Sequence, residues 1–416
     1  MREMKDSGVD WIGDIPAHWE VKRIKDVCNV VCGATPKDRA SYWDGDIIWI
    51  SPSDMSELGE IKEGARTITE QGYQSCGTSL VPEGSIVMST RAPIGKINIA
   101  TNELCTNQGC KCLTSTKLNM KFMLYYMWSK NKQFQALGRG TTFIELSTKD
   151  LSLFLFAIPP IEEQQAIADY LDKKTAEIDE QISLFEQKQN AYTKLKQSLI
   201  SQVVTRGLNP NAPLKNSGID WIGEIPAHWE VRRFKAFAKT IKGKSYDTLN
   251  EPFDGSYKVL SVECLRQDEA QFYDYVFVDD ENQICTSNDI VVIWDGAGVG
   301  EFLKAKDGVL SSTIAKIQLT NKSVILPYLW YWRYKVEYRL KSIPTGMGIP
   351  HLNPTLLNNF KIAIPPIEEQ QAIADYLDKK TAEIDEQISN IDKKINTYKR
   401  LKQSLIDEVV TGKRKI

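Results

Sequence analysis

The chain has 416 residues, of which 42% are hydrophobic and 25% are charged, and its formal net charge is −2. This length predicts two or three independently packed domains, because single hydrophobic cores stop growing well below it. No stretch approaches the run of about 18 apolar residues that a membrane span needs, and the N-terminal residues lack the apolar core of a signal peptide, so we expect a cytoplasmic protein without membrane contacts.

The acidic balance is confined to particular segments. Residues 157–205 and 363–411 each carry an excess of three negative charges, whereas residues 22–156 and 232–362 carry excesses of three and two positive charges. The whole-chain charge would argue against a nucleic-acid partner. The charge of each segment instead leaves two mildly basic globular parts, each able to carry a surface that faces phosphate groups.

The sequence is an internal duplication. The segment SGVDWIGDIPAHWEVKRIK at Ser7–Lys25 returns as SGIDWIGEIPAHWEVRRFK at Ser217–Lys235. The segment Ala157–Ser183 returns without a single change as Ala363–Ser389. Between these repeats the two halves differ in most positions, which predicts one structural frame used twice with two different recognition surfaces.

The two unlike segments are expected to share one mixed α/β fold. Each contains an apolar strand, a polar turn with glycine and a second strand, at Gly84–Ala100 and at Asn288–Ala305. Each then contains an aromatic-rich helix, which begins near Met120 in the first half and near Leu326 in the second.

Each identical segment predicts the start of a long helix. Pro160 and Pro366 suit a first helical turn, and the glutamates that follow suit the positive end of the helix dipole. Gly207 and Gly412 suit the helix ends. Between them, apolar residues recur with spacings of three, four and seven residues, which is typical of a coiled coil. This seam consists of Ile167, Leu171, Ile178, Ile182, Phe185, Tyr192, Leu195 and Leu199 in the first helix, and of Ile373, Leu377, Ile384, Ile388, Ile391, Tyr398, Leu401 and Leu405 in the second.

We expect the two helices to pair with each other, which for about 45 residues each gives a rod of roughly 65 Å. The alternative is that each helix packs separately on its own globular domain. The predicted domains are residues 1–156 and 208–362 for the recognition parts, and residues 157–207 and 363–416 for the long helices.

Three cysteines raise a zinc hypothesis. Cys105, Cys110 and Cys112 have the spacing C-x4-C-x-C, but no histidine lies near them and the second half has no counterpart. Buried free thiols are therefore the preferred interpretation, and we expect no metal in this chain.

Motifs for catalysis are incomplete in this sequence. Gly243-Lys244-Ser245 matches the end of a phosphate-binding loop, but Ala238 stands where the first glycine is required. His18 and His228 lie in matching I-P-A-H-W turns, where packing is a more plausible role than catalysis. The tetrapeptides that amino-methyltransferases use to hold a flipped base are absent. We therefore expect no catalytic residues.

The repeated segments resemble those of one known family. The W-I-G-[DE]-I-P-x-H-W-E-V segments at Trp11 and Trp221, the I-P-P-I-E-E-Q-Q-A-I-A-x-Y-L segments at Ile158 and Ile364, and the two unlike inserts closely resemble the specificity subunit of Type I restriction-modification systems. The resemblance covers essentially the whole chain.

This resemblance implies two pseudo-symmetric α/β target-recognition domains separated by an antiparallel two-helix coiled coil. Each domain is expected to read one half of an asymmetric, bipartite site in double-stranded DNA. The resemblance also implies two modification subunits, which use S-adenosylmethionine to methylate adenine, and restriction subunits, which use ATP and Mg. No cofactor is expected in this chain itself.

Polar and cationic residues on loops of the unlike segments are the candidates for contact with bases and phosphates. In the first half these are Thr35, Lys37, Arg39, Ser51, Ser53, Arg91, Lys96, Lys111, Thr141 and Thr142. In the second half they are Lys242, Lys244, Ser245, Tyr246, Ser261, Trp294, Asp295, Lys304 and Lys316. Arg91 is the strongest single candidate, because a guanidinium in a turn can bind a guanine edge or a phosphate; a solvated loop arginine is the alternative.

Two other functional classes compete with this interpretation. The first is a fused enzyme that methylates or cuts DNA itself, which the missing motifs oppose. The second is a coiled-coil interaction protein without a DNA role, which a DNA-binding experiment would distinguish.

Overall fold

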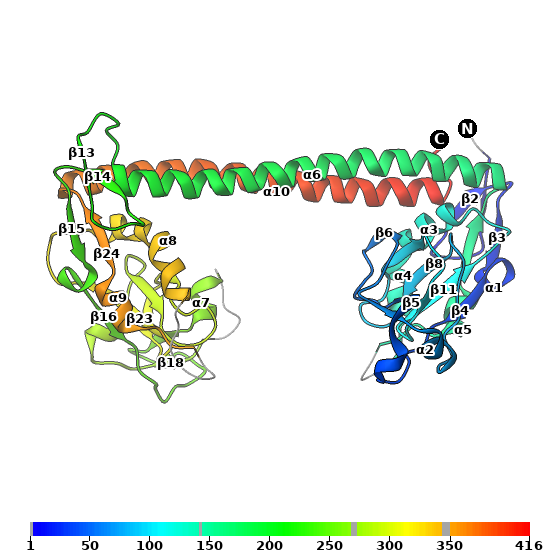
Figure 1. Ribbon diagram of the computed structural model, residues 1–416, viewed down its shortest axis with the longest axis horizontal. Helices are drawn as coiled ribbons and strands as arrows, with labels where there is room; N and C mark the ends of the chain where they lie inside the picture. Colours follow the sequence, from blue (N-terminus) through cyan, green and yellow to red (C-terminus); the bar gives the residue numbers. More distant parts are fainter. Residues whose placement is uncertain (1–2, 141–143, 268–272, 343–349) are drawn as a thin grey trace. The chain divides into compact units, whose positions relative to one another are not determined.

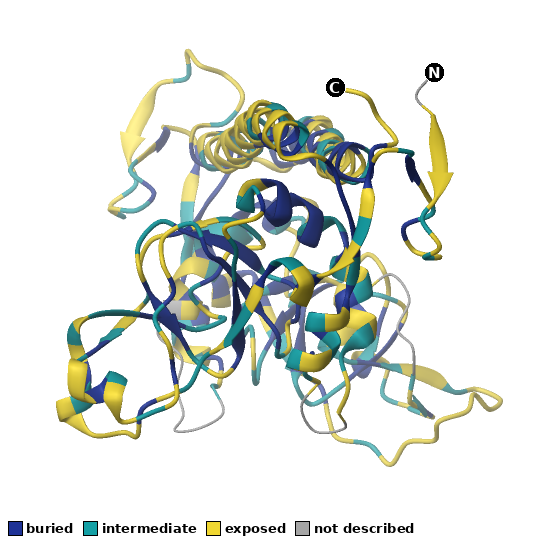
Figure 2. Cartoon of the chain, turned by 90° about the vertical axis from the view of Figure 1, so that its right-hand side faces the viewer, coloured by how far each residue is buried: buried dark blue, intermediate teal, exposed yellow. Residues whose placement is uncertain are grey.

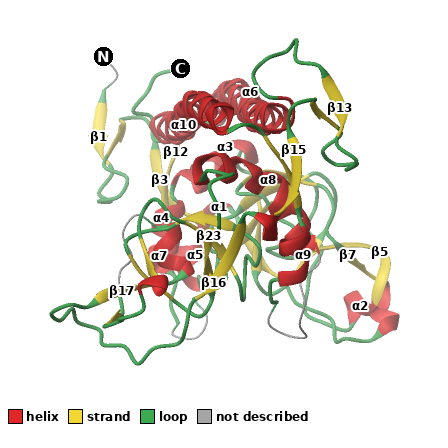
Figure 3. Cartoon of the chain, turned by 90° about the vertical axis from the view of Figure 1, so that its left-hand side faces the viewer, coloured by secondary structure: helices red, strands yellow, loops and turns green. Residues whose placement is uncertain are grey.

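The computed structural model describes residues 3–140, 144–267, 273–342 and 350–416. Its contacts divide the chain into two compact units (Figure 1). The first unit comprises Met1–Glu186 with Lys393–Ile416, and the second comprises Gln187–Asp392. Each unit combines small sheets with helices, as the sequence predicted (Figure 3). Whereas the predicted boundaries gave each long helix a segment of its own, the contacts assign part of each helix to each unit.

The first unit is built on two small sheets with order β4-β11-β8-β9-β6 and β10-β5-β7, together with the pairs β1-β2 and β3-β12. Its strands are β1 (Met4–Asp6), β2 (Asp14–Pro16), β3 (Glu20–Arg23), β4 (Asn29–Cys32), β5 (Trp43–Ile50), β6 (Leu58–Ile61), β7 (Arg66–Ile68), β8 (Ile86–Ser89), β9 (Ile97–Ala100), β10 (Cys105–Thr106), β11 (Cys110–Thr114) and β12 (Leu155–Ile158). Its short helices are α1 (Ile24–Val27), η1 (Ala40–Tyr42), α2 (Glu70–Gln74), α3 (Met120–Ser129), α4 (Asn131–Leu137) and α5 (Thr148–Leu153).

The second unit has sheets of order β16-β23-β20-β21 and β18-β17-β22-β19, with the pairs β13-β14 and β15-β24. Its strands are β13 (Leu214–Asn216), β14 (Glu224–Pro226), β15 (Glu230–Arg233), β16 (Ala238–Lys242), β17 (Tyr257–Leu260), β18 (Tyr275–Val276), β19 (Ile284–Cys285), β20 (Ile290–Ile293), β21 (Phe302–Lys304), β22 (Gly308–Leu310), β23 (Ile314–Leu319) and β24 (Lys361–Ile364). Its shorter helices are η2 (Phe234–Ala236), α7 (Val262–Arg266), η3 (Glu281–Gln283), α8 (Leu326–Ser342) and α9 (Pro354–Asn359).

The two unlike segments share a topology. The order β4-β11-β8-β9 in the first unit corresponds to β16-β23-β20-β21 in the second, and in both units the neighbouring strands are antiparallel. In the second sheet of each unit, β10 lies parallel to β5 and β22 lies parallel to β17. The predicted strand-turn-strand segments are the β8-β9 and β20-β21 hairpins. Both β8 and β20 are buried at every position, which explains their uninterrupted apolar sequences.

The predicted aromatic helices are α3 and α8. Helix α3 begins after Asn119, whose side chain accepts a hydrogen bond from the Phe122 backbone N–H at 2.9 Å and so caps the first turn. Its residues from Phe122 to Met127 are buried. In α8, Tyr328 and Trp332 are fully buried, so the aromatic residues supply the core beneath the long helices.

The long helices are α6 (Ile161–Arg206, 46 residues) and α10 (Ile367–Val410, 44 residues). Each begins directly after a Pro-Pro pair and ends at a glycine with a left-handed backbone, Gly207 with φ 71° and Gly412 with φ 72°. The predicted helix starts and ends are therefore confirmed, and the glycines serve because residues with a Cβ are strained in this conformation.

The two long helices pair antiparallel within each unit. In the first unit, Lys402 Nζ lies 2.6 Å from Asp179 Oδ2, and the rings of Phe185 and Tyr398 are 5.5 Å apart. In the second unit, Lys196 Nζ lies 2.6 Å from Asp385 Oδ2, while Gln189 donates a 2.6 Å hydrogen bond to Asp392. As the residue numbers in α6 increase, the residue numbers of their partners in α10 decrease, so the two helices run antiparallel.

The predicted seam is partly correct. Most of its residues are buried or half-buried, but Leu195 and Leu401 have exposed fractions of 53% and 50%, so their assignment to the interface is wrong. The residues that follow them, Lys196 and Lys402, turn inward and form the two ion pairs. A straight helix has 3.6 residues per turn, so its contact face drifts away from a strict 3.5-residue repeat.

The helix ends also pack on the globular parts, so pairing and docking both occur. Ile200, Val203 and Val204 of α6 and Ile373 and Leu377 of α10 belong to the same hydrophobic core in the second unit. Over the rest of their length the long helices are largely exposed (Figure 2), with a narrow row of buried and half-buried residues along each. The C-terminal part of α6 therefore contributes to the core of the second unit rather than of the first.

A tryptophan anchors each N-terminal repeat to a long helix. Trp19 and Trp229 are fully buried, and each indole N–H donates a 3.1 Å hydrogen bond to a glutamate of the first helical turn, Glu163 or Glu369. The neighbouring histidine Nε2 lies 2.8 Å from the same carboxylate in both units. This places His18 and His228 in structural contacts.

The seam analysis predicts different costs for two leucines of the second unit. Leu377→Ala is expected to lower the free energy of unfolding by about 2–5 kcal/mol, because Leu377 is fully buried and its loss leaves a cavity. Leu195→Ala is expected to change it by less than about 0.5 kcal/mol. Urea unfolding followed by circular dichroism measures both, and similar losses for the two variants would contradict the assigned interface.

The helix ends predict a second difference, now in the first unit. Gly412 and Gly13 have similar positive φ angles, but a Cβ on Gly412 would lie 2.5 Å from Pro16 Cδ, whereas a Cβ on Gly13 meets nothing within 4 Å. Both changes to alanine incur about 1–2 kcal/mol of backbone strain. Gly412→Ala should show a further loss, measured as a lower urea midpoint than that of the Gly13→Ala control; equal midpoints would argue against the close contact with Pro16.

Candidate DNA-binding surfaces

In the first unit, the turn after β8 carries a charged cluster. Arg91 Nε donates a 2.9 Å hydrogen bond to Glu145 Oε2, and Lys111 Nζ lies 3.3 Å from Glu145 Oε1. The backbone holds the two segments together, because the N–H of Leu146 donates to the carbonyl of Thr90 at 2.8 Å. One carboxylate therefore lies between two cations from different parts of the chain.

The two cations of this cluster differ in exposure. The side chain of Arg91 is 41% exposed, whereas that of Lys111 is 4% exposed. Lys111 Nζ also donates to the Thr90 hydroxyl at 3.2 Å and to the Leu146 carbonyl at 2.9 Å. Burial thus removes Lys111 from the residues placed to touch DNA, and leaves Arg91 facing solvent.

Glu145 is held in its charged form. Partial burial alone would raise the pKa of Glu145, but the hydrogen bonds from Arg91 and Lys111 outweigh it and hold the pKa below its usual range. The charged Glu145 carboxylate orients the Arg91 guanidinium by accepting its Nε–H, and a guanidinium has further N–H groups that can bind a ligand.

The second unit has a corresponding cluster after β20. Asp295 lies 2.8 Å from Lys242 Nζ and 2.6 Å from His351 Nδ1. The N–H of Leu352 donates to the carbonyl of Trp294 at 2.8 Å, which matches the Leu146 bond of the first unit. Burial alone would raise the pKa of Asp295, but hydrogen bonds from His351 and Lys242 hold it below its usual value.

The further candidates of the first unit that the structure describes lie on loops and are exposed or half-buried. Lys96 Nζ donates to the Pro52 carbonyl at 3.0 Å, which brings it to the loop of Ser51 and Ser53; the two serine hydroxyls are 2.7 Å apart. Thr35 bonds to Gln108. Lys37 and Arg39 are exposed, and Arg39 Nη1 donates to the Tyr42 hydroxyl at 3.3 Å. Thr141 and Thr142 fall outside the described residues.

Several candidates of the second unit have contacts within the protein. Lys316 is 9% exposed and donates to the Ile284 carbonyl at 2.5 Å, so burial removes it from the surface. Ser261 caps α7 by accepting a hydrogen bond from the Cys264 N–H at 3.2 Å. Lys244 Nζ lies 3.3 Å from Asp280 Oδ2, and the Tyr246 hydroxyl donates to Gln283 Oε1 at 3.2 Å. Ser245 is exposed. The Trp294 ring lies 5.8 Å from Lys242 Nζ.

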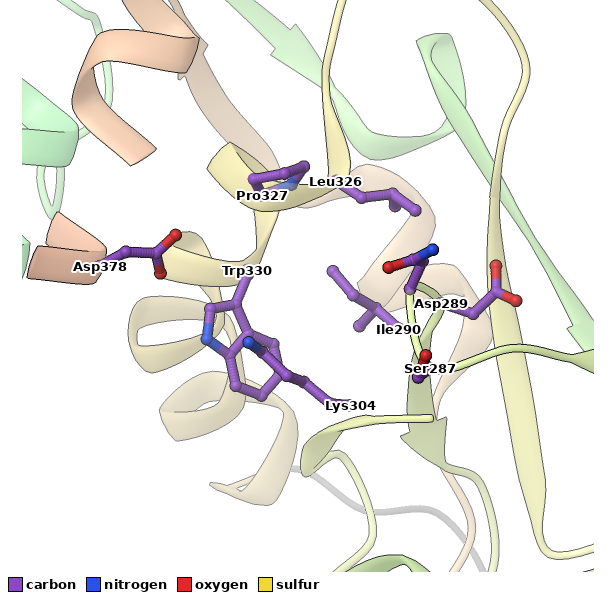
Figure 4. Close-up of a pocket in the computed structure, with 9 residues that line it drawn as sticks. Ser287, Asp289, Ile290, Lys304, Leu326, Pro327, Trp330 and Asp378 are labelled. Carbon is purple, nitrogen blue, oxygen red and sulfur yellow. The ribbon is translucent and has the colours of Figure 1, made fainter. Parts of the chain in front are cut away.

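Lys304 lies apart from the Asp295 cluster, in a pocket of about 160 Å³ between the β20-β21 hairpin and α8 (Figure 4). Its Nζ is 5.5 Å from the centre of the Trp330 ring. Asp378 of α10 also lines this pocket, with one oxygen accepting a hydrogen bond from the Tyr331 hydroxyl. The pocket thus combines one aromatic side chain with groups of both charges.

Sequence analysis missed Glu145 and His351. Each lies more than 50 residues from its partner, Arg91 or Asp295, and neither belongs to a recognised motif. One signal was present, because both residues directly precede a leucine, Leu146 or Leu352, at matching places in the duplicated halves.

The described residues contain no group of three His, Cys, Asp or Glu side chains arranged to bind a metal ion. The eight cysteines are free thiols, and burial raises the pKa of Cys105 to about 11. None of the helices within residues 3–140, 144–267, 273–342 and 350–416 is both long and apolar enough to span a bilayer.

Comparison with known proteins identifies the family. The chain matches the family described as "Type I restriction modification DNA specificity domain" twice, over residues 16–185 and 226–395. It is 27% identical to the Type I restriction enzyme MjaIX specificity subunit of Methanocaldococcus jannaschii, over 97% of this chain and 95% of that protein. It is 37% identical to the MjaVIII specificity subunit of the same organism, over 45% of this chain and 43% of that protein.

The fold is also similar to solved structures. A chain from work on complex assembly and conformational transition of the type I R-M system superposes with a TM-score of 0.73 at 17% identity, covering 95% of this chain and 98% of that one. The duplicated frame, the paired helices and the two matched units agree with these similarities, and the chain belongs to the family of Type I restriction-modification DNA specificity subunits.

Proposed function

We propose that this chain is the DNA sequence-recognition subunit of a Type I restriction-modification complex, in which each unit reads one half of an asymmetric, bipartite target. The observation that carries the proposal is the pair of charged clusters. Both follow the central strand of an equivalent sheet, yet one contains Arg91 and Glu145 and the other contains Asp295 and His351. Equivalent places with different side chains favour different half-sites.

The long helices are proposed to set the spacing between the half-sites and to dock two modification subunits. Their first 23 residues are identical in sequence, and their solvent-facing positions match; Asp169 and Asp375 are exposed, as are Glu180 and Glu386. Two copies of one partner protein would therefore meet the same side chains twice. Paired helices that kept a constant separation between the two reading units would set the half-site spacing, as dimer geometry does in other DNA-binding proteins.

The proposed role assigns no catalysis to this chain. Modification subunits would supply S-adenosylmethionine-dependent methylation, and restriction subunits would supply ATP- and Mg-dependent translocation and cleavage of double-stranded DNA. The complex would act on DNA in the cytoplasm.

A methylation experiment tests the proposal. The purified chain, alone and with its modification subunit, is incubated with S-adenosylmethionine and genomic DNA, and N6-methyladenine is mapped. We expect methylation at one asymmetric bipartite motif in the presence of both proteins, because recognition and chemistry lie in different chains. Methylation by the chain alone would support a fused enzyme, and an absence of sequence-dependent DNA binding in the complex would support a purely structural coiled-coil protein.

The Arg91 geometry yields a residue-level prediction. Arg91→Ala is expected to weaken binding to the half-site of the first unit by about 1–3 kcal/mol, the usual contribution of a bidentate arginine contact to a base. Fluorescence anisotropy with duplexes that keep one half-site at a time measures the change. Arg23→Ala is the control, because Arg23 is also a partly exposed arginine and pairs with Asp26; equal effects of both variants would remove Arg91 from the recognition surface.

A further inference from the structure

The two long helices end in nearly the same sequence. We call these ends the docking segments, residues 195–205 of α6 and residues 401–411 of α10; they read LKQSLISQVVT and LKQSLIDEVVT. They differ at two positions, where Ser201 and Gln202 of α6 correspond to Asp407 and Glu408 of α10. The isoleucine and the two valines of each segment are buried in its unit. Hydrophobic contact alone therefore does not distinguish one docking segment from the other.

One of the two differences is matched in the globular part of the first unit. Lys130 directly follows α3 and is 3% exposed, and its Nζ lies 2.6 Å from Asp407 Oδ1. By contrast, Glu408 accepts a 2.8 Å hydrogen bond from Ser404 of its own helix and lies 3.8 Å from Arg414 of the C-terminal tail. Asp407 is therefore the position at which the docking segment of α10 makes a contact specific to the first unit.

An offset of 206 residues identifies the equivalent positions of the second unit. The Tyr125 hydroxyl of α3 donates to Asp172 at 2.8 Å, and the Tyr331 hydroxyl of α8 donates to Asp378. Both members of these two hydrogen bonds are separated by the same offset. The offset thus relates α3 to α8 and the docking segment of α6 to that of α10.

Both members of the ion pair are different in the second unit. By this offset, Val336 stands in the place of Lys130, and Ser201 stands in the place of Asp407. Val336 is 4% exposed and belongs to the hydrophobic core that also contains Ile200 of the docking segment. The docking segment with a carboxylate therefore packs in the unit with a buried lysine, and the one with a serine packs in the unit with a buried valine.

This matching matters because each long helix has the features needed to pair with a copy of itself. The first 23 residues of α6 and α10 are identical, so α6 of one molecule carries the apolar row that would pair with α6 of a second molecule. In that pairing, Ser201 of the second copy would take the place of Asp407 and leave Lys130 buried without a carboxylate. In a pairing of α10 with α10, Asp407 would lie at Val336, beside a buried apolar side chain.

Both of these pairings are unfavourable, because a buried charge without a partner is strongly destabilising. The pairing of α6 with α10 in one molecule leaves neither charge unpaired. Specific interfaces commonly exclude wrong partners by such unpaired charges.

We infer that the Lys130–Asp407 ion pair selects α10 of the same molecule, rather than α6 of a second copy, as the helix that completes the first unit. The replacement of both residues in the second unit, by Val336 and Ser201, excludes α10 of a second copy there. The selection keeps the two unlike units together in one molecule. It goes beyond the proposed function, because it concerns how the chain assembles and involves no DNA.

A substitution cycle in the full chain tests the ion pair. Asp407→Ser gives the docking segment of α10 the residue of α6, and we expect it to lower the melting temperature by roughly 4–10 °C, because Lys130 stays buried and loses its carboxylate. Adding Lys130→Val reproduces the neutral pair of the second unit and should restore more than half of this loss. Thermal melting followed by circular dichroism measures each variant.

Asp179→Ser is the matched control for this cycle. Asp179 is also a helix carboxylate of the first unit, but it pairs with Lys402 of the other long helix at 2.6 Å. Lys130→Val should therefore not rescue the Asp179→Ser variant.

The oligomeric state tests the selection of the partner helix. An exchange variant, Ser201→Asp with Asp407→Ser, moves the carboxylate from α10 to α6. Light scattering after size-exclusion chromatography should find the unchanged chain monomeric and the exchange variant associated, because α6 of a second copy now carries the carboxylate that pairs with Lys130. Adding Lys130→Val and Val336→Lys moves the lysine as well and should return the protein to the monomer.

Three results would overturn the inference: association of the unchanged chain, equal melting temperatures of Asp407→Ser with and without Lys130→Val, and a monomeric exchange variant. If Asp407→Ser does not fold alone, recovery of a folded chain by Lys130→Val is the expected rescue, and failure of the double variant to fold contradicts the inference. These measurements contain no DNA, so their failure is distinct from a failure of the methylation experiment that tests the proposed function.

Discussion

The fold of each unit depends on one buried tryptophan and the glutamate that binds it. Trp19 and Trp229 are fully buried and donate their indole N–H to Glu163 and Glu369 in the first turn of a long helix. The glycine that ends the opposite helix lies against the same ring: a Cβ on Gly412 would be 3.2 Å from Trp19, and a Cβ on Gly207 would be 3.1 Å from Trp229.

This contact gives the repeated segments the same structural role in both units. A charge-assisted hydrogen bond inside a packed site is stronger than a neutral one, and the same glutamate also lies 2.8 Å from the neighbouring histidine in each unit. The tryptophan side chain contacts both the first turn of one long helix and the glycine that ends the other. Because α6 ends in the second unit and α10 ends in the first, each unit is completed by residues from both halves of the sequence.

The features predicted correctly from the sequence are those specified by local chemistry or by the duplication itself. Pro160, Gly207 and their counterparts mark the ends of the long helices, and the apolar runs of β8 and β20 identify buried strands. Leu195 and Leu401 were assigned incorrectly because the contact face of a nearly straight helix drifts by about 20° per heptad. The pairs Arg91–Glu145 and Asp295–His351 join residues more than 50 positions apart, so only the folded topology brings them together.

Charge counted along a segment also proved a poor guide to charge at the surface. Two lysines that contribute to the basic excess of the first half are almost fully buried: Lys111 binds Glu145, and Lys130 binds Asp407 at 2.6 Å. The Asp407 carboxylate comes from α10, so part of the acidity of the long helix neutralises the core of the globular part. The positive potential available to DNA therefore depends on a few exposed cations, and the carboxylates beside them fix where those cations point.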